Sequence, residues 1–148
     1  MNDAPDPAKP LLTGKAIYEK VRDHLLKQGN RAEVDIPNKG FGFSCAYRGE
    51  RGTKCAAGCL IDDAHYSPEF EGVSLSVDRH SAKFETSERI WKAIFDSGVE
   101  DTPANRRLVT KLQDIHDHAP IISWPGALFD LALRFGFEEP GPEVTIIS

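Results

Sequence analysis

The sequence predicts an α+β fold that is mostly α, with about five helices packed around a short β-hairpin or a small antiparallel sheet. Apolar residues recur at helical spacing behind the N-terminal arm and through the C-terminal half of the chain. Two short segments, 41–47 and 73–77, instead alternate apolar with small or polar residues, as strands with one buried face do. A turn with two glycines follows the first segment, and we expect the two segments to pair.

The chain is expected to form one domain with irregular ends. Its 148 residues are 40% hydrophobic and 28% charged, which is the composition of an ordinary globular protein. A chain of this length buries roughly 70% of its surface on folding. We expect a flexible arm at residues 1–12, a globular domain at 13–137 and an irregular tail at 138–148, because prolines and polar residues interrupt both ends.

Charge and hydropathy narrow the classes of function. The formal net charge is −5, which argues against broad nucleic-acid binding because such binding requires an excess of Lys and Arg. No run of about 18 apolar residues occurs, so we expect no membrane-spanning helix. The N-terminus is acidic and proline-rich, unlike a secretory signal, and we therefore expect a cytoplasmic protein with reduced cysteines.

The first predicted helix begins behind Thr13, a suitable N-cap, and ends before Gly29. The apolar residues on its buried face recur every four positions, and they are Ile17, Val21 and Leu25. Three more helices are expected in the C-terminal half. They lie between residues 86 and 98, between Thr102 and about Asp117, and between Ser123 and Gly136. A proline in the first turn supports the start of the last two.

The segment 41–65 contains all three cysteines of the chain and a histidine. A fifth, short helix is expected at 55–64. Three thiolates and an imidazole form a legitimate zinc-binding set, although the spacing differs from that of common structural zinc sites. The residues of this set are Cys45, Cys55, Cys59 and His65. Buried, unreactive thiols are the alternative interpretation, because free cysteine often behaves as a small hydrophobic residue.

A second hypothesis makes Cys55 a nucleophile. A cysteine at a helix N-terminus beside Lys54 would have a lowered pKa. His116 could act as its base with Asp117 as the orienting residue, and the cysteine-before-histidine order is that of papain-like enzymes. The alternative base and orienting residue are His118 and Asp114. The residues around the cysteine carry no signature of such an enzyme, and histidines in the last turn of a helix also suit its dipole.

The glycine-rich turn YRGERG matches no phosphate-binding motif. Its Arg48 and Arg51 could contact an acidic partner, and the alternative is a solvated turn. Aromatic residues are enriched at binding hot spots, which makes Tyr66 and Trp124 further candidates for binding. Core positions are the alternative for such aromatic residues.

The strings CAYRGERGTKCAAGCLIDDAHYSPEFEG (45–72) and KLQDIHDHAPIISWPGALFDLALRFGF (111–137) resemble a family of short phage- and prophage-associated proteins of proteobacteria. The shared features are a Tyr-Arg-Gly turn, a Lys-Cys-Ala helix start, an Ile-His-Asp segment and a following Trp. They correspond here to Tyr47, Arg48, Gly49, Lys54, Cys55, Ala56, Ile115, His116, Asp117 and Trp124. The resemblance implies an origin but no activity. It also implies that the Cys59 position varies in the family, which disfavours zinc.

The preferred hypothesis is a non-enzymatic cytosolic accessory protein that binds another protein. Its partner would be host-encoded, and the chain would act as an inhibitor or adaptor carried by a mobile element. The first alternative is a small cysteine-dependent hydrolase or transferase that uses Cys55 and His116. The second is a zinc-stabilised binding domain. Apart from zinc, no cofactor is expected.

Overall fold

The computed structural model describes residues 11–35 and 43–137. In this part of the chain there are four α-helices, which are α1 (Lys15–Gln28), α2 (Phe84–Asp96), α3 (Pro103–His118) and α4 (Trp124–Arg134). Two three-residue strands, β1 (Glu33–Asp35) and β2 (Phe43–Cys45), pair antiparallel. The described residues also form short 3₁₀ turns, which are η1 (Glu50–Gly52), η2 (Gly58–Leu60), η3 (Asp63–His65), η4 (Pro68–Phe70) and η5 (Ile121–Ser123).

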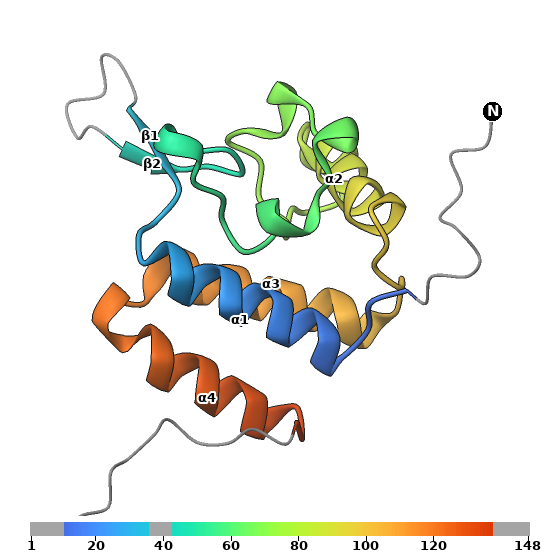
Figure 1. The fold of residues 1–148 in the computed structure, drawn as a ribbon. Coiled ribbons are helices and arrows are strands. Elements are labelled where there is room, and N and C mark those ends of the chain that lie inside the picture. Colours follow the sequence, from blue (N-terminus) through green and yellow to red (C-terminus); the bar gives the residue numbers. More distant parts are fainter. Residues whose placement is uncertain (1–10, 36–42, 138–148) are drawn as a thin grey trace, which may run out of the picture.

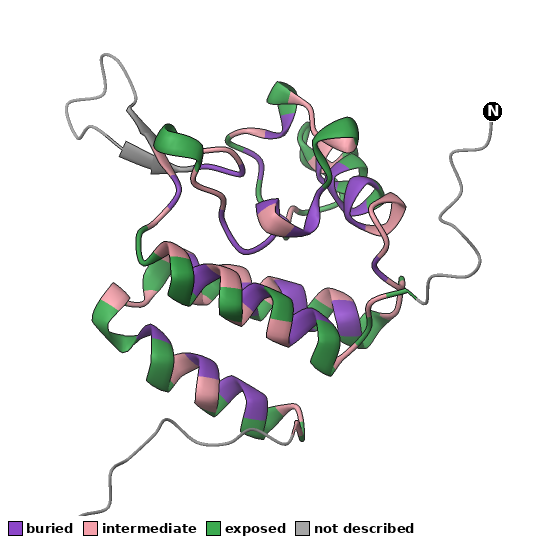
Figure 2. Ribbon diagram, in the orientation of Figure 1, coloured by how far each residue is buried: buried purple, intermediate pink, exposed green. Residues whose placement is uncertain are grey.

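Helices α1, α3 and α4 pack on one another, with α1 in front of α3 and α4 below both in the view of Figure 1. The buried residues lie on the sides of these helices that face inward (Figure 2). Each fully buried aliphatic side chain contributes about 1.5–3 kcal/mol. Such side chains in this layer include Ile17, Val21, Leu25, Leu108, Leu112 and Leu128. The four-residue spacing seen in the sequence therefore builds the core.

Helix α2 packs against the turns η3 and η4 of the irregular segment 46–83, above the three-helix layer (Figure 1). Two of its side chains bind the backbone of that segment. Trp91 donates its indole N–H to the carbonyl of Leu75 at 3.0 Å, and Ser87 donates its hydroxyl to the carbonyl of Ser74 at 2.8 Å. These bonds attach the segment to α2.

The helix ends follow the local signals in most places. The Thr102 hydroxyl accepts the N–H of Asn105 at 3.0 Å and caps α3, as predicted. Gly29 ends α1 in the left-handed conformation with φ 67°, also as predicted. Thr13, however, is not the N-cap of α1. Gly14 occupies that position, because the Thr13 hydroxyl is engaged by the side chain of Asn105.

The predicted α+β architecture is wrong. The described part of the chain is a helical fold in which helices pack on one another and on an irregular segment, and no helix packs around a sheet. β2 pairs with β1, and the two short strands lie at one end of the molecule (Figure 1). Residues 73–77 form bends instead of a strand, because carbonyls of this stretch accept hydrogen bonds from α2 side chains instead of from a neighbouring strand.

The short helix predicted at 55–64 is also absent. The turns η2 and η3 take its place, and Ile61 between them is extended, with φ −102° and ψ 119°. In an α-helix over 55–64 the N–H of Asp62 would donate to the Gly58 carbonyl. Here the Gly58 carbonyl accepts from the guanidinium of Arg48 at 2.7 Å, and the Asp62 N–H donates to the hydroxyl of Ser97 at 2.8 Å. Tertiary contacts therefore override the helical pattern.

The N-terminal arm predicted at 1–12 is held at its last residue. Leu12 forms a parallel bridge with Val99, through bonds from its N–H to the carbonyl of Gly98 at 2.8 Å and from the Glu100 N–H to its carbonyl at 2.9 Å. The rest of the arm and the tail predicted at 138–148 lie outside the described residues. No helix of the described ranges is long and apolar enough to span a membrane.

Candidate functional site

The turn around Tyr47, Arg48 and Gly49 is a structural junction. The backbone N–H groups of Tyr47 and Arg48 donate to the two carboxylate oxygens of Glu71, at 2.9 and 3.0 Å. Tyr66 donates its hydroxyl to the same carboxylate at 2.6 Å. Charge-assisted hydrogen bonds are roughly twice as strong as neutral ones. Glu71 therefore anchors the turn that the sequence singled out as a binding candidate.

Arg48 points into this junction. Its guanidinium donates to the carbonyls of Gly58 and Ile61, each at 2.7 Å. It also pairs with Asp63 at 3.1 Å and lies 4.7 Å from the centre of the Tyr66 ring. The structure thus places Arg48 and Tyr66, two of the predicted binding residues, in the internal scaffold of the segment.

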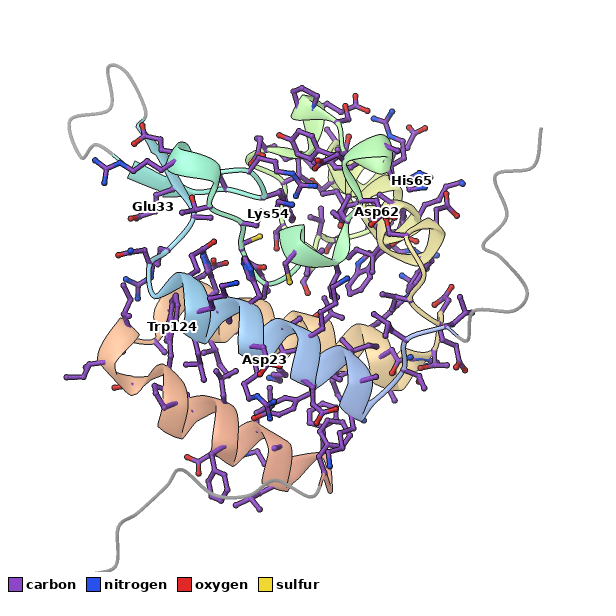
Figure 3. All side chains as sticks on the ribbon, viewed as in Figure 1. Asp23, Glu33, Lys54, Asp62, His65 and Trp124 are labelled. Carbon is purple, nitrogen blue, oxygen red and sulfur yellow. The ribbon has the colours of Figure 1, made fainter. Side chains whose placement is uncertain are left out.

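The other two predicted binding residues differ in exposure. Arg51 is exposed in η1 and has φ 59°, a left-handed conformation that is uncommon for residues other than glycine. Trp124 is 1% exposed and donates its indole N–H to the carbonyl of Ala119 at 3.1 Å. It lies at the start of α4 on the side facing α1 and α3 (Figure 3), so it is a core residue.

The backbone immediately before Cys55 is held by α1. His24 donates a hydrogen bond from its Nε2–H to the carbonyl of Lys54, with 2.8 Å between the two atoms. Burial lowers the pKa of His24, because the imidazolium loses water on entering this contact, although the Lys54 carbonyl opposes the effect. Lys54 lies above α1 in Figure 3. The cysteine-bearing segment is therefore attached to α1 at a defined point.

The Cys55 thiol is buried, with 1% of the residue exposed. Its sulfur accepts the backbone N–H of Gly58 at 3.3 Å. Burial raises the pKa of this thiol, and the negative charges of Asp117 and Glu71 raise it further. The prediction of a lowered pKa required an α-helix N-terminus at this position, and the structure has a turn there. The arrangement keeps Cys55 protonated.

His116 is fully buried and uses both ring nitrogens for internal hydrogen bonds. Its Nε2 accepts the backbone N–H of Ala32 at 2.9 Å, which requires the proton to be on Nδ1. Nδ1 donates to the carboxylate of Asp117 at 2.7 Å. The imidazole also stacks on Trp124, with 5.8 Å between the ring centres. This imidazole positions the chain at Ala32 and has no nitrogen left to accept a proton from a thiol.

The predicted catalytic residues are therefore only partly brought together. Asp117 accepts a hydrogen bond from His116, but the hydrogen bonds of Cys55 and of His116 go to different partners and not to each other. Cys55 and Asp117 do line one common hollow, and the histidine beside them there is His118. A protonated thiol in this hollow is a poor nucleophile.

The described members of the predicted zinc set are not arranged as a metal site. Cys59 donates its S–H to the carbonyl of Ala56 at 3.1 Å, and burial raises its pKa to about 12. His65 lies half-buried in η3. Within the described ranges, no group of three or more His, Cys, Asp or Glu residues is placed to hold a metal ion. The side chain of Cys45 lies outside the described residues.

The surface hollows detected in the described residues gather around α3. The hollow that contains the Cys55 thiol has a volume of about 280 Å³ and lies between α3 and the irregular segment; we call it the thiol hollow. A groove of about 460 Å³ lies between α3 and α4; we call it the α3–α4 groove. Asp114 and His118 border both. The exposed face of α3 is thus raised between two depressions.

This exposed face of α3 carries an ordered row of charges, which we call the α3 ridge. Its members, at helical spacings of four, three and four residues, are Arg107, Lys111, Asp114 and His118, all of them exposed. The sequence analysis considered Asp114 and His118 only as catalytic alternatives and missed Arg107 and Lys111. The signal that could have identified them is their position opposite the buried stripe of Leu108 and Leu112.

No protein family, curated protein or solved structure matches the chain. The resemblance to phage- and prophage-associated proteins therefore stays a prediction.

Proposed function

We propose that the chain is a non-enzymatic accessory domain that binds another protein through the α3 ridge and the two depressions beside it. The observation that supports this most directly is the position of the ridge. Of its four exposed polar side chains, Asp114 and His118 border both the thiol hollow and the α3–α4 groove, and Lys111 borders the groove. Cys55 and His116, the residues that the cysteine-hydrolase alternative would use, are engaged in internal hydrogen bonds.

The α3–α4 groove has the composition of a protein interface. Its lining combines apolar side chains such as Ile115 and Leu131 with charged ones such as Lys111, Asp130 and Arg134. Protein interfaces place apolar contacts at the centre and polar groups at the rim. Grooves between helices commonly accept a helix of the partner. The groove therefore supplies contact area, and the ridge supplies charges that select the partner.

The proposal extends to the role of the partner. A small acidic domain with the predicted origin would act on a host protein, as an inhibitor or an adaptor. This part of the proposal rests on the resemblance found in the sequence, which is an associational argument.

The experiment is affinity capture from a proteobacterial lysate with matched variants. The ridge variant replaces Lys111 and Asp114 by alanine, and the control variant replaces Lys15 and Glu85, so both keep the net charge. All four side chains are exposed, and exposed substitutions usually change stability by less than about 0.5 kcal/mol. We expect the wild type and the control to retain the same protein and the ridge variant to lose it. Retention by the ridge variant, or no retained protein at low and at physiological salt, contradicts the proposal.

A further inference from the structure

The two halves of the α3 ridge carry opposite charges. Arg107 and Lys111 make its N-terminal half basic, and Asp114 gives its C-terminal half an acidic residue. Several other exposed charges pair within the chain, for example Lys92 with Asp96 at 2.6 Å. By contrast, none of the ion pairs found among the described residues includes Lys111 or Asp114. The central charges of the ridge are therefore available to an external partner.

The order of these charges makes the ridge complementary to a second copy of itself. In a helix each residue rises about 1.5 Å, so Lys111 and Asp114 lie about 4.5 Å apart along the axis. When two copies of α3 run antiparallel with a two-fold axis between these residues, Lys111 of each copy faces Asp114 of the other. A single self-complementary patch is the requirement for a symmetric two-chain interface.

The surroundings of the ridge allow this approach. The residues lining the α3–α4 groove include Ala119 and Ala127, whose small side chains leave room for a helix ridge. A groove between two helices can accept the side of a third helix. In the two-fold arrangement each copy offers one ridge and one groove, so both copies make the same contacts.

We propose that two copies of the chain associate through their α3 ridges in this antiparallel arrangement. The occupant of the groove is the ridge of the second copy. Each exposed ion pair contributes little, so the association is weak and weakens further with salt. The inference goes beyond the proposed function, because it concerns the purified chain alone. It also implies that a second copy and the protein partner compete for the same face.

The experiment is sedimentation equilibrium of the full chain at low and high salt, with charge-reversal variants. Lys111→Asp places two acids at the centre of the ridge, and Asp114→Lys places two lysines there. We expect the wild type to self-associate at low salt and each variant to associate at least about tenfold more weakly, which corresponds to 1.4 kcal/mol. An equimolar mixture of the two variants should recover the association, because each Asp then faces a Lys. Lys15→Asp on α1 is the control and should behave as wild type.

Three results would overturn the inference. They are a wild-type chain that stays monomeric at low salt up to millimolar concentration, a single reversal that associates as strongly as wild type, and a mixture that associates no better than its components. Circular dichroism establishes that each variant is folded before it is used. The mixture distinguishes a lost charge pair from general damage, since two damaged chains cannot restore each other. Capture of a protein partner is measured separately, so either proposal can fail without the other.

Discussion

The side-chain amide of Gln28 pairs with both backbone groups of Lys54. Its Oε1 accepts the Lys54 N–H at 2.9 Å, and its Nε2 donates to the Lys54 carbonyl at 3.0 Å. One side chain of α1 thus provides the donor and the acceptor that a neighbouring strand would provide. This pairing fixes the backbone of Lys54, the residue immediately before Cys55. It explains why the chain at Cys55 begins a turn that rests on α1 and does not begin an α-helix.

Replacing Gln28 with alanine should therefore destabilise the protein. The substitution leaves the partly buried N–H of Lys54 without its acceptor, whereas the Lys54 carbonyl keeps its hydrogen bond from His24. Leaving such a group unsatisfied costs roughly 1–3 kcal/mol. Urea unfolding followed by circular dichroism measures the loss. Lys27→Ala is the matched control, because Lys27 is the exposed neighbour of Gln28. Equal midpoints for the two variants would contradict this account.

A second prediction concerns the close approach of Gly58 to the Tyr47 carbonyl. A Cβ at Gly58 would overlap the oxygen of that carbonyl and come within 3.1 Å of its carbon. Backbone cannot yield as a flexible side chain does, so Gly58→Ala should cost several kcal/mol, of the order of 2–4. The glycine is not needed for a positive φ angle here but for the space beside Tyr47.

Gly126 provides the control for this prediction. It lies within α4, and a Cβ there meets no atom within 4 Å. Alanine is favoured over glycine in a helix by about 0.5–1 kcal/mol. We therefore expect Gly126→Ala to raise the unfolding midpoint in urea and Gly58→Ala to lower it. A raised midpoint in both variants would mean that the contact with Tyr47 is not close, and a lowered midpoint in both would contradict the open space beside Gly126.

These contacts show which parts of the fold a sequence can predict. The cap at Thr102 and the end at Gly29 depend on atoms a few residues away, so local patterns identified them. The predicted helix at 55–64 needed a hydrogen bond from the Asp62 N–H to the Gly58 carbonyl. That carbonyl accepts from Arg48, ten residues away, and the N–H donates to Ser97, 35 residues away. The spacing of apolar residues within a segment carries no information about distant side chains that compete for its backbone hydrogen bonds.

The candidate site shows the same limit. The order of Cys55 and His116 in the chain suggested a catalytic pair, and both residue types were suitable. The sequence could not show that the His116 ring would accept the backbone N–H of Ala32, 84 residues away. Buried N–H groups need acceptors, and here the nearest one is the imidazole. The α3 ridge, in contrast, was readable as the polar face opposite Leu108 and Leu112.

A third prediction follows from the raised pKa of Cys59. In the folded chain this thiol has a pKa of about 12, against 9 in the unfolded chain. Between pH 9 and pH 12 the folded state therefore binds more protons than the unfolded state, and stability falls as the pH rises. The thiol contributes its full stabilisation below pH 9 and loses it through this window. One thiol changes the slope of the free energy of unfolding against pH by up to about 1.4 kcal/mol per pH unit.

Cys59→Ala tests this dependence. The variant cannot ionise at this position, so its free energy of unfolding should fall less steeply above pH 9 than that of the wild type. Urea unfolding at several alkaline pH values gives the two slopes. Other groups with raised pKa values, such as Tyr47, contribute equally to both proteins and cancel in the difference. Parallel slopes would mean that the Cys59 thiol is solvated in the folded state.

The last prediction distinguishes a buried Cys55 from an enzymatic nucleophile. In a variant that keeps Cys55 as its single cysteine, a thiol reagent should react at least about a hundredfold more slowly than with a free thiol, because a fully buried group reacts only when the structure opens. Urea below the unfolding transition should accelerate the reaction in proportion to the open population. After complete unfolding the rate should equal that of a free thiol, which provides the internal control.

An activated nucleophile behaves in the opposite way, since its thiolate persists at about pH 6 and reacts fastest in the folded state. Rapid labelling of the folded protein at that pH would therefore revive the cysteine-hydrolase alternative, with His118 of the thiol hollow and not His116 as the candidate base.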